Sequence, residues 1–159
     1  MRPVVVIGLG NLLLSDEGVG VHVIRALEEQ AASFPEVDLL DLGAGGLSVL
    51  YAISGRRKAI LVDCALMGEP PGTLRRFAPE EVRTVKALSG FSLHEGDLVR
   101  VLELARELGQ APEEVVIFGI QPADVSPGQE LSPILQGRLQ EYVDRVAAEL
   151  AELQSAYAG

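Results

Sequence analysis

Short apolar runs rich in β-branched residues alternate along this chain with longer stretches in which apolar residues recur at helical spacing. The first pattern is typical of strands buried in a parallel sheet, and the second is typical of amphipathic helices. The apolar runs predict strands over residues 3–8, 37–42, 59–62 and 115–120, with an edge strand over 73–77. The helical spacing predicts helices over residues 16–34, 47–53, 92–109 and 133–154.

This alternation predicts a single α/β domain over residues 1–159, a three-layer α/β/α fold whose twisted, mostly parallel central sheet has about five strands. Right-handed crossovers place helices on both faces of such a sheet, and ligands bind at the carboxyl ends of its strands. If the first three strands lie in the order 2-1-3, the first and third strands are neighbours, and residues that follow them face each other across one crevice.

Two acids and a histidine stand where predicted strands give way to helices. Glu17 follows the loop after the first strand, Asp63 ends the third, and His94 lies just inside a helix that Ser92 caps. Taken singly, Glu17 is an ordinary acid of a first helical turn and His94 a core histidine. Together they predict a metal site with three ligands and an open position, an arrangement used in hydrolytic chemistry. Their spacing leaves zinc, nickel and manganese open.

Other residues with possible chemistry have simpler interpretations. Gly8 and Gly10 begin a dinucleotide-binding pattern, but Leu13 stands where its third glycine belongs, so the pair indicates a tight turn. Asp16 is interpreted as a helix N-cap. His22 falls on a polar helical face and is expected to be solvated, and Cys64 is expected to be a buried structural thiol.

Composition narrows the classes of partner. A formal net charge of −10 argues against nucleic acid, because phosphates would be repelled. One cysteine cannot form an intrachain disulfide or a cysteine-based zinc cluster, and it fits a reducing compartment. No apolar stretch approaches the roughly 18 residues of a membrane helix. We therefore expect a cytoplasmic protein without nucleic-acid or membrane partners.

Four segments resemble the hydrogenase maturation endopeptidases: GLGNLLLSDEGVG at 8–20, VDCA at 62–65, SLHE at 92–95 and GIQP at 119–122. The resemblance spans nearly the whole chain. It implies an α/β endopeptidase that removes the C-terminal extension from the large-subunit precursor of a nickel–iron hydrogenase. It also implies that the partner is the nickel-loaded precursor, and that the enzyme is a monomer.

The resemblance also assigns roles to residues. Carried over position by position, it makes Glu17, Asp63 and His94 both the metal ligands and the catalytic residues. The metal is nickel supplied by the precursor, for which another divalent ion could substitute. Asp41 matches an acid that precedes the family's glycine-rich loop and helps to position substrate. This chain departs from the family pattern at Leu42, which separates Asp41 from the first glycine of that loop.

Two alternatives stay open at this point. An aspartic-type mechanism would have Asp16 or Glu17 share a proton with Asp63. A non-enzymatic α/β module that senses nickel or a nucleotide is the alternative from a different functional class, and the Gly8–Gly10 turn is its direct support.

Overall fold

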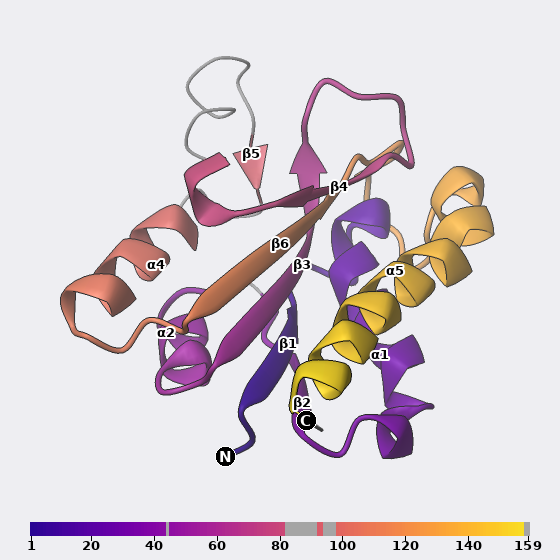
Figure 1. The fold of residues 1–159 in the computed structure, drawn as a ribbon. Coiled ribbons are helices and arrows are strands. Elements are labelled where there is room, and N and C mark those ends of the chain that lie inside the picture. Colours follow the sequence, from indigo (N-terminus) through magenta and orange to yellow (C-terminus); the bar gives the residue numbers. More distant parts are fainter. Residues whose placement is uncertain (44, 82–91, 94–97, 158–159) are drawn as a thin grey trace.

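Five strands lie side by side in the order β2–β1–β3–β6–β4, between two layers of helices (Figure 1). The computed structural model describes residues 1–43, 45–81, 92–93 and 98–157. Four strands are parallel: β1 (Val4–Gly8), β2 (Val37–Asp41), β3 (Lys58–Leu66) and β6 (Glu114–Ile120). Two are antiparallel to their neighbours: the edge strand β4 (Leu74–Phe77) beside β6, and the short β5 (Ser92–Leu93) beside the end of β3. The predicted fold class is confirmed, and the first three strands have the 2-1-3 order that makes β1 and β3 neighbours.

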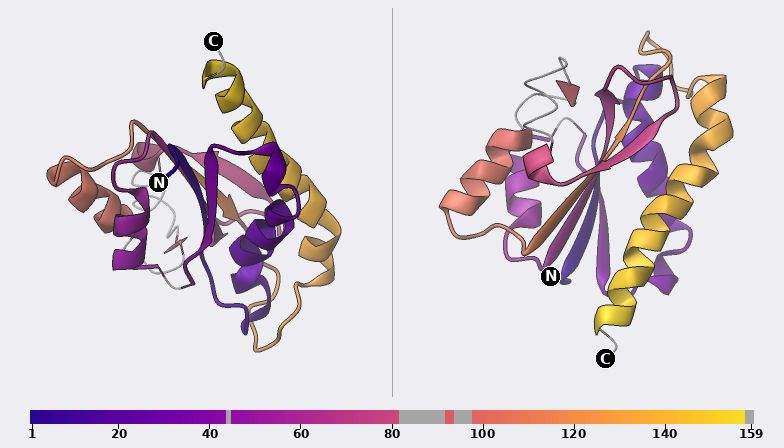
Figure 2. Two further views of the ribbon diagram at one scale, coloured as in Figure 1. Left: turned by 90° about the horizontal axis from the view of Figure 1, so that it is seen from below. Right: turned by 45° about the horizontal axis from the view of Figure 1, so that its top comes forward.

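Helices cover both faces of the sheet. Figure 2 shows α1 (Val19–Glu28) and α5 (Pro133–Tyr157) on one face, with α2 (Leu47–Ile53) and α4 (Leu98–Glu107) on the other. Alternate residues of each strand face opposite layers, as strand geometry requires. Val6 and Val62 therefore pack in the core under α1 and α5, whereas Ile7 and Leu61 pack in the core under α2 and α4. Burial on both faces explains why these strands are continuous apolar runs.

Some predicted boundaries are wrong. The first helix ends at Glu28 rather than near residue 34, and short 3-10 turns flank it: η1 (Ser15–Gly18) and η2 (Ala31–Ser33). The helix expected to open at Ser92 does not start there, because Leu93 pairs with Ala65 in β5. That pairing holds the chain extended at the position where a Ser92 cap would need the first helical residue.

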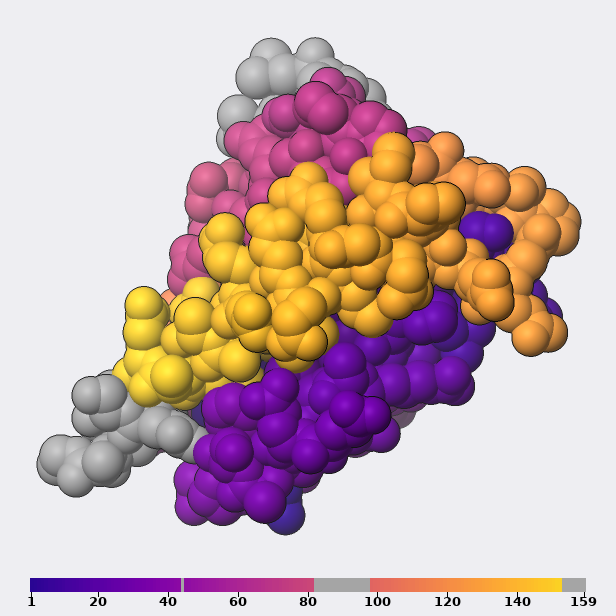
Figure 3. Space-filling view, turned by 90° about the vertical axis from the view of Figure 1, so that its right-hand side faces the viewer, coloured from indigo at the N-terminus to yellow at the C-terminus, as the bar shows by residue number. Residues whose placement is uncertain are grey.

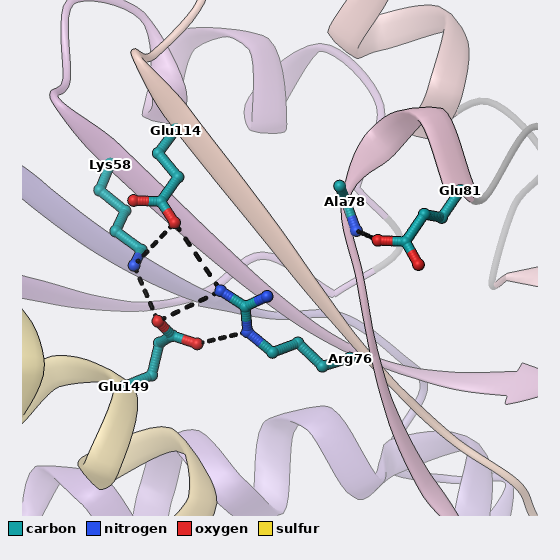
Figure 4. Close-up of polar contacts among 6 residues, drawn as sticks. All are labelled: Lys58, Arg76, Ala78, Glu81, Glu114 and Glu149. Atoms are coloured by element: carbon teal, nitrogen blue, oxygen red, sulfur yellow. Dashed lines mark hydrogen bonds and ion pairs between the residues drawn. The ribbon is translucent and has the colours of Figure 1, made fainter.

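A cluster of four charged side chains joins α5 to the amino ends of β3 and β6 (Figure 4). Lys58 Nζ lies 2.9 Å from one carboxylate oxygen of Glu149, and Arg76 Nε lies 2.6 Å from the other. Glu114 completes the cluster at 3.3 Å from Lys58 and 3.7 Å from Arg76. Burial is the largest single influence and opposes ionisation of Glu149, but the hydrogen bonds and positive charges of Arg76 and Lys58 together outweigh it and lower the pKa of Glu149.

No helix in the described ranges combines the length and the apolar character that crossing a bilayer demands.

Candidate active site at the carboxyl edge of the sheet

The sheet opens between β1 and β3 at Asp63. The last residue of β1, Gly8, pairs with Val62, so the pairing between the two strands ends one residue before Asp63. Asp63 itself pairs with Gly119 of β6 and is fully buried. The prediction that Asp63 ends its strand is wrong, since β3 continues to Leu66 with β6 and β5 as partners. Regular strand backbone therefore fixes this carboxylate at the opening.

Two glycines let the first turn of α1 approach this opening. A Cβ at Gly20 would lie 2.2 Å from the carbonyl oxygen of Val62, and a Cβ at Gly8 would lie 2.5 Å from the carbonyl oxygen of Gly20. Any larger residue would push the helix away from the strands. The close packing brings η1, which carries Glu17 just before α1, against β3.

Gly10 explains the glycine pair of the N-terminal loop. Its φ is +132°, and a Cβ there would lie 1.9 Å from the carbonyl oxygen of Glu17. The glycine thus lets the loop pass directly against the turn that holds Glu17. The structure supports the interpretation of this pair as a tight turn, with a packing function at the candidate site.

Glu17 and Asp63 act on the same neighbour, the thiol of Cys64. Burial raises the pKa of Cys64, and the negative charges of Asp63, Glu17 and Asp16 raise it further, in that order. Glu17 is half-buried, whereas Asp16, Asp63 and Cys64 are buried. Carboxylates from two separate segments of the chain therefore act on one thiol. The predicted burial of Cys64 is confirmed, and its protonated thiol is not suited to nucleophilic attack.

Asp16 does not cap a helix, contrary to the sequence-based interpretation. The η1 turn has no side-chain cap, and Asp16 instead bonds to the loop after β6. Its carboxylate accepts hydrogen bonds from the backbone N–H groups of Ala123, Asp124 and Ser132 at 2.9, 3.0 and 2.7 Å. A fourth bond, of 2.7 Å, comes from the Ser132 hydroxyl. These donors use both oxygens of Asp16, so this residue does not fit a proton-sharing pair with Asp63.

Asp41 lies at the same edge, at the end of β2. It is exposed, and its side chain accepts a hydrogen bond from the backbone N–H of Gly43 at 3.1 Å. The Gly43 carbonyl in turn accepts a bond from Gly10 N–H at 2.8 Å, which ties this loop to the one beside Glu17. Asp41 is thus open to a ligand at the edge that also holds Glu17 and Asp63.

His94 lies outside the described residues, so its place as the third ligand stays a prediction. Its chain neighbour Leu93 pairs with Ala65, two residues after Asp63. Within the described part of the chain, no three His, Cys, Asp or Glu residues are grouped so as to hold a metal ion.

His22 differs from its predicted environment. It is half-buried rather than solvated, and its Nε2 is buried with no hydrogen-bond partner. Burial lowers the pKa of His22, the charge of Arg25 lowers it further, and Asp16 opposes both. Helical spacing in the sequence places His22 on a polar face of α1. It does not show that other parts of the fold cover this part of the helix.

The loop of residues 121–132 is the part of the site that the sequence did not reveal. Gln121 anchors it: the side-chain oxygen accepts bonds from Met67 N–H at 2.7 Å and from Glu69 N–H at 3.4 Å. Figure 3 shows this loop, in orange, around indigo-to-purple atoms of the N-terminal part of the chain. Its only signal in the sequence was the GIQP segment at its start.

Comparisons with known proteins agree with this architecture. The sequence profile of the hydrogenase maturation protease family matches residues 21–149. The hydrogenase expression/formation protein HoxM of Cupriavidus necator is 34% identical over 145 residues, which are 91% of this chain and 72% of HoxM. The hydrogenase 2 maturation protease of Escherichia coli is 30% identical over 150 residues, which are 94% of this chain and 91% of that protein.

Solved structures give the same result. The hydrogenase maturating endopeptidase HybD from E. coli superposes with a TM-score of 0.82 at 30% identity, covering 96% of this chain and 93% of HybD. The [NiFe] hydrogenase maturation protease HybD from Thermococcus kodakarensis superposes with a TM-score of 0.76 at 26% identity, covering 95% of this chain and 99% of that one.

Proposed function

Because this chain belongs to the hydrogenase maturation protease family, whose members are peptide-bond hydrolases, we propose that its substrate is the large-subunit precursor of a nickel–iron hydrogenase. In this proposal the enzyme removes the C-terminal extension of the precursor after nickel has been loaded. The match of the fold over nearly its whole length to solved maturation endopeptidases supports it.

Glu17 and Asp63 would bind the nickel that the precursor carries, with His94 as the third ligand. The observation that carries this assignment is the packing of η1, which holds Glu17, against β3, which holds Asp63 just past the last pair of β1 and β3. The charges of both acids accordingly raise the pKa of the Cys64 thiol. Carboxylates and imidazole are suitable ligands for nickel and other divalent metals. A metal ion held in this way polarises a scissile carbonyl or activates a water molecule.

This division of ligands would make cleavage a test of metal loading. If part of the coordination sphere comes from the precursor and part from this chain, the scissile bond is held at the site only when nickel is present. We propose that Asp41, exposed at the same edge, contacts the precursor beside the metal site. We also propose that the protein acts as a monomer in the cytoplasm.

The test compares nickel-loaded with nickel-free precursor. Purified protein is mixed with each form, and intact mass follows loss of the C-terminal extension. We expect cleavage of the loaded form alone. Equal cleavage of both forms would favour the aspartic-type mechanism with Glu17 and Asp63. No cleavage of either form, with tight binding of nickel or a nucleotide in calorimetry, would favour the sensing module.

Asp41 is tested in the same assay. We expect Asp41→Asn to raise KM about tenfold with little change in kcat, because its contact would be equal in the ground state and the transition state. Asp144→Asn, which changes an exposed carboxylate on α5, is the matched control. A fall in kcat with unchanged KM would contradict a role in substrate binding.

A further inference from the structure

The turn that carries Glu17 has little local support. It is a 3-10 turn of four residues, Ser15–Gly18, and its preceding residue Leu14 makes no side-chain cap bond. Ser15 has a φ of +52°, a left-handed conformation that is strained for a residue other than glycine. So short a turn is not stable alone. Contacts from elsewhere in the chain must therefore determine where Glu17 points.

Those contacts come from the loop after β6, more than 100 positions later in the chain. Asp16 is fully buried, and its carboxylate receives the four hydrogen bonds described above. The backbone N–H of Asp16 donates to the Asp124 carbonyl at 2.9 Å, so the two segments are bonded in both directions. Hydrogen bonds to an ionised acceptor are about twice as strong as neutral ones. Asp16 is therefore the main anchor of the turn.

Ser15 adds to the same attachment. Its backbone N–H donates to the Gly128 carbonyl at 2.9 Å, and its hydroxyl donates to the Ser126 carbonyl at 2.7 Å. These bonds hold Ser15 in its strained conformation. Ser15 and Asp16 together fix the backbone on the amino side of Glu17, while Gly10 packs against its carbonyl.

The anchor is connected to a rigid element. Ser132, which binds Asp16 through both its N–H and its hydroxyl, stands at the start of α5. Its carbonyl accepts the Gln136 N–H at 2.8 Å, and its hydroxyl accepts the Leu135 N–H at 3.4 Å. α5 is in turn tied to the sheet by Glu149 in its second half (Figure 4). The position of the turn is thus set by the longest helix among the described elements.

We propose that Asp16 is a positioning residue for Glu17: through the 121–132 loop and the start of α5, it sets the direction in which Glu17 meets the substrate. The inference rests on the proposed function insofar as Glu17 acts on the precursor. Asp16 touches neither metal nor substrate in this arrangement. It acts on Glu17 by holding the η1 turn in place.

A double-mutant cycle tests the coupling. Asp16→Asn keeps the shape of the side chain but replaces one acceptor oxygen by a donor group, which then faces other donors. We expect kcat to fall about tenfold to a hundredfold, the usual cost of displacing a catalytic group by about 1 Å, with KM nearly constant. In a Glu17→Gln background the same change should lower kcat by less than about twofold, because the group it positions is already lost.

Amide hydrogen exchange gives a reading that needs no substrate. In Asp16→Asn, exchange at Ser15, Asp16 and Glu17 should accelerate about tenfold or more, while exchange in β1 stays unchanged. Asp38→Asn is the matched control, because Asp38 is also a hydrogen-bonded carboxylate but lies at the amino end of β2, paired with Arg56. It should leave both the exchange of the turn and kcat unchanged.

The kinetic cycle and the exchange measurement can each contradict a positioning role for Asp16. Equal losses of kcat from Asp16→Asn in both backgrounds, or unchanged exchange at the turn, would overturn the proposal. If Asp16→Asn does not fold, Ser132→Ala keeps the backbone bonds to Asp16 but removes the hydroxyl bond, together with the long contact of that hydroxyl with Leu135 N–H, and should give the same pattern with an effect of about threefold. If the wild-type protein cleaves no precursor, the proposed function fails. In that case the positioning role of Asp16 is tested separately from the proposed function. The test is amide hydrogen exchange in Asp16→Asn, together with the direction of Glu17 in a crystal structure of that variant.

Discussion

The amino and carboxyl ends of the sheet differ in whether their buried charges are paired with opposite charges. At the amino end, Lys58 and Glu149 pair directly and Arg76 reinforces the pair, so opposite charges offset each other. At the carboxyl end, the negative charges of Asp63, Glu17 and Asp16 all add to the effect of burial and raise the pKa of the Cys64 thiol. Paired charges fix the relative position of two elements. A concentration of like charge is costly for folding and is suited to a cationic ligand, which is the pattern of a functional site.

The sharpest way to test this contrast is to remove charge at the carboxyl end. We expect Glu17→Gln and Asp63→Asn each to lower cleavage of the nickel-loaded precursor about a thousandfold, a loss typical of groups that act directly in hydrolysis. For Glu17→Gln, which changes a half-buried side chain, the free energy of unfolding should move by less than about 1 kcal/mol. Kinetic assays and urea unfolding measure the two effects. Full activity in both variants would show that the gathered acids are structural.

Removing a charge at the amino end should have the reverse effect. Lys58→Met leaves the buried Glu149 with Arg76 as its one remaining close cationic partner and should lower the free energy of unfolding by up to about 3–5 kcal/mol. Cleavage per folded molecule should stay the same. Glu114→Gln is the control, because that carboxylate is about half exposed and its ion pairs contribute less than about 1 kcal/mol. Equal destabilisation by both variants would contradict the assignment of Glu149 as the centre of the cluster.

The close approach of α1 to the carboxyl end offers a third test. Gly20→Ala would place a Cβ 2.2 Å from the Val62 carbonyl oxygen, and we expect it to cost about 2–3 kcal/mol and to lower kcat by moving the helix that follows Glu17. Gly137→Ala in α5 is the matched control. A Cβ there meets nothing within 4 Å, so the change should stabilise by up to about 1 kcal/mol. Similar effects at both glycines would refute the packing argument.

The amino-end cluster also predicts a pH dependence. The pKa of Glu149 is lower in the folded than in the unfolded protein, so the folded state binds a proton less readily. Its contribution to stability is therefore complete above its ordinary pKa of 4.5 and is lost as pH falls through the lower, folded value. Urea unfolding between about pH 6 and pH 3 should show a shallower loss in Glu149→Gln than in the wild type. Parallel curves would show that Glu149 is not responsible.

The smallest expected effect is at Cys64. Because burial and the surrounding acids keep its thiol protonated, the native protein should react with thiol reagents only on unfolding. Cys64→Ala should leave cleavage within about twofold of the wild type and cost about 1 kcal/mol of stability. A large loss of activity with stability intact would assign the thiol a direct part in catalysis.

Local patterns were enough to predict the elements that the sheet buries. Each apolar β-branched run became a strand, and Glu17, Asp63 and Asp41, which stand at or beyond the ends of three of these runs, lie toward the carboxyl edge of the sheet. The errors fell where tertiary pairing outweighs local preference. β3 extends past Asp63 because β6 and β5 are there to pair with it, and Ser92 enters a strand rather than a helix for the same reason.

The three-layer α/β fold could be predicted from the sequence alone, because burial period and turn residues are local properties of the chain, and four short motifs were enough to identify the family. The surroundings of each polar group, in contrast, depend on how distant segments pack together in the fold. The fold turned Asp16 from an expected helix cap into the anchor of a loop more than 100 residues away, and it covered His22. The physical reason is that a buried carboxylate must find donors wherever the fold brings them, and spacing along the chain does not record where that is.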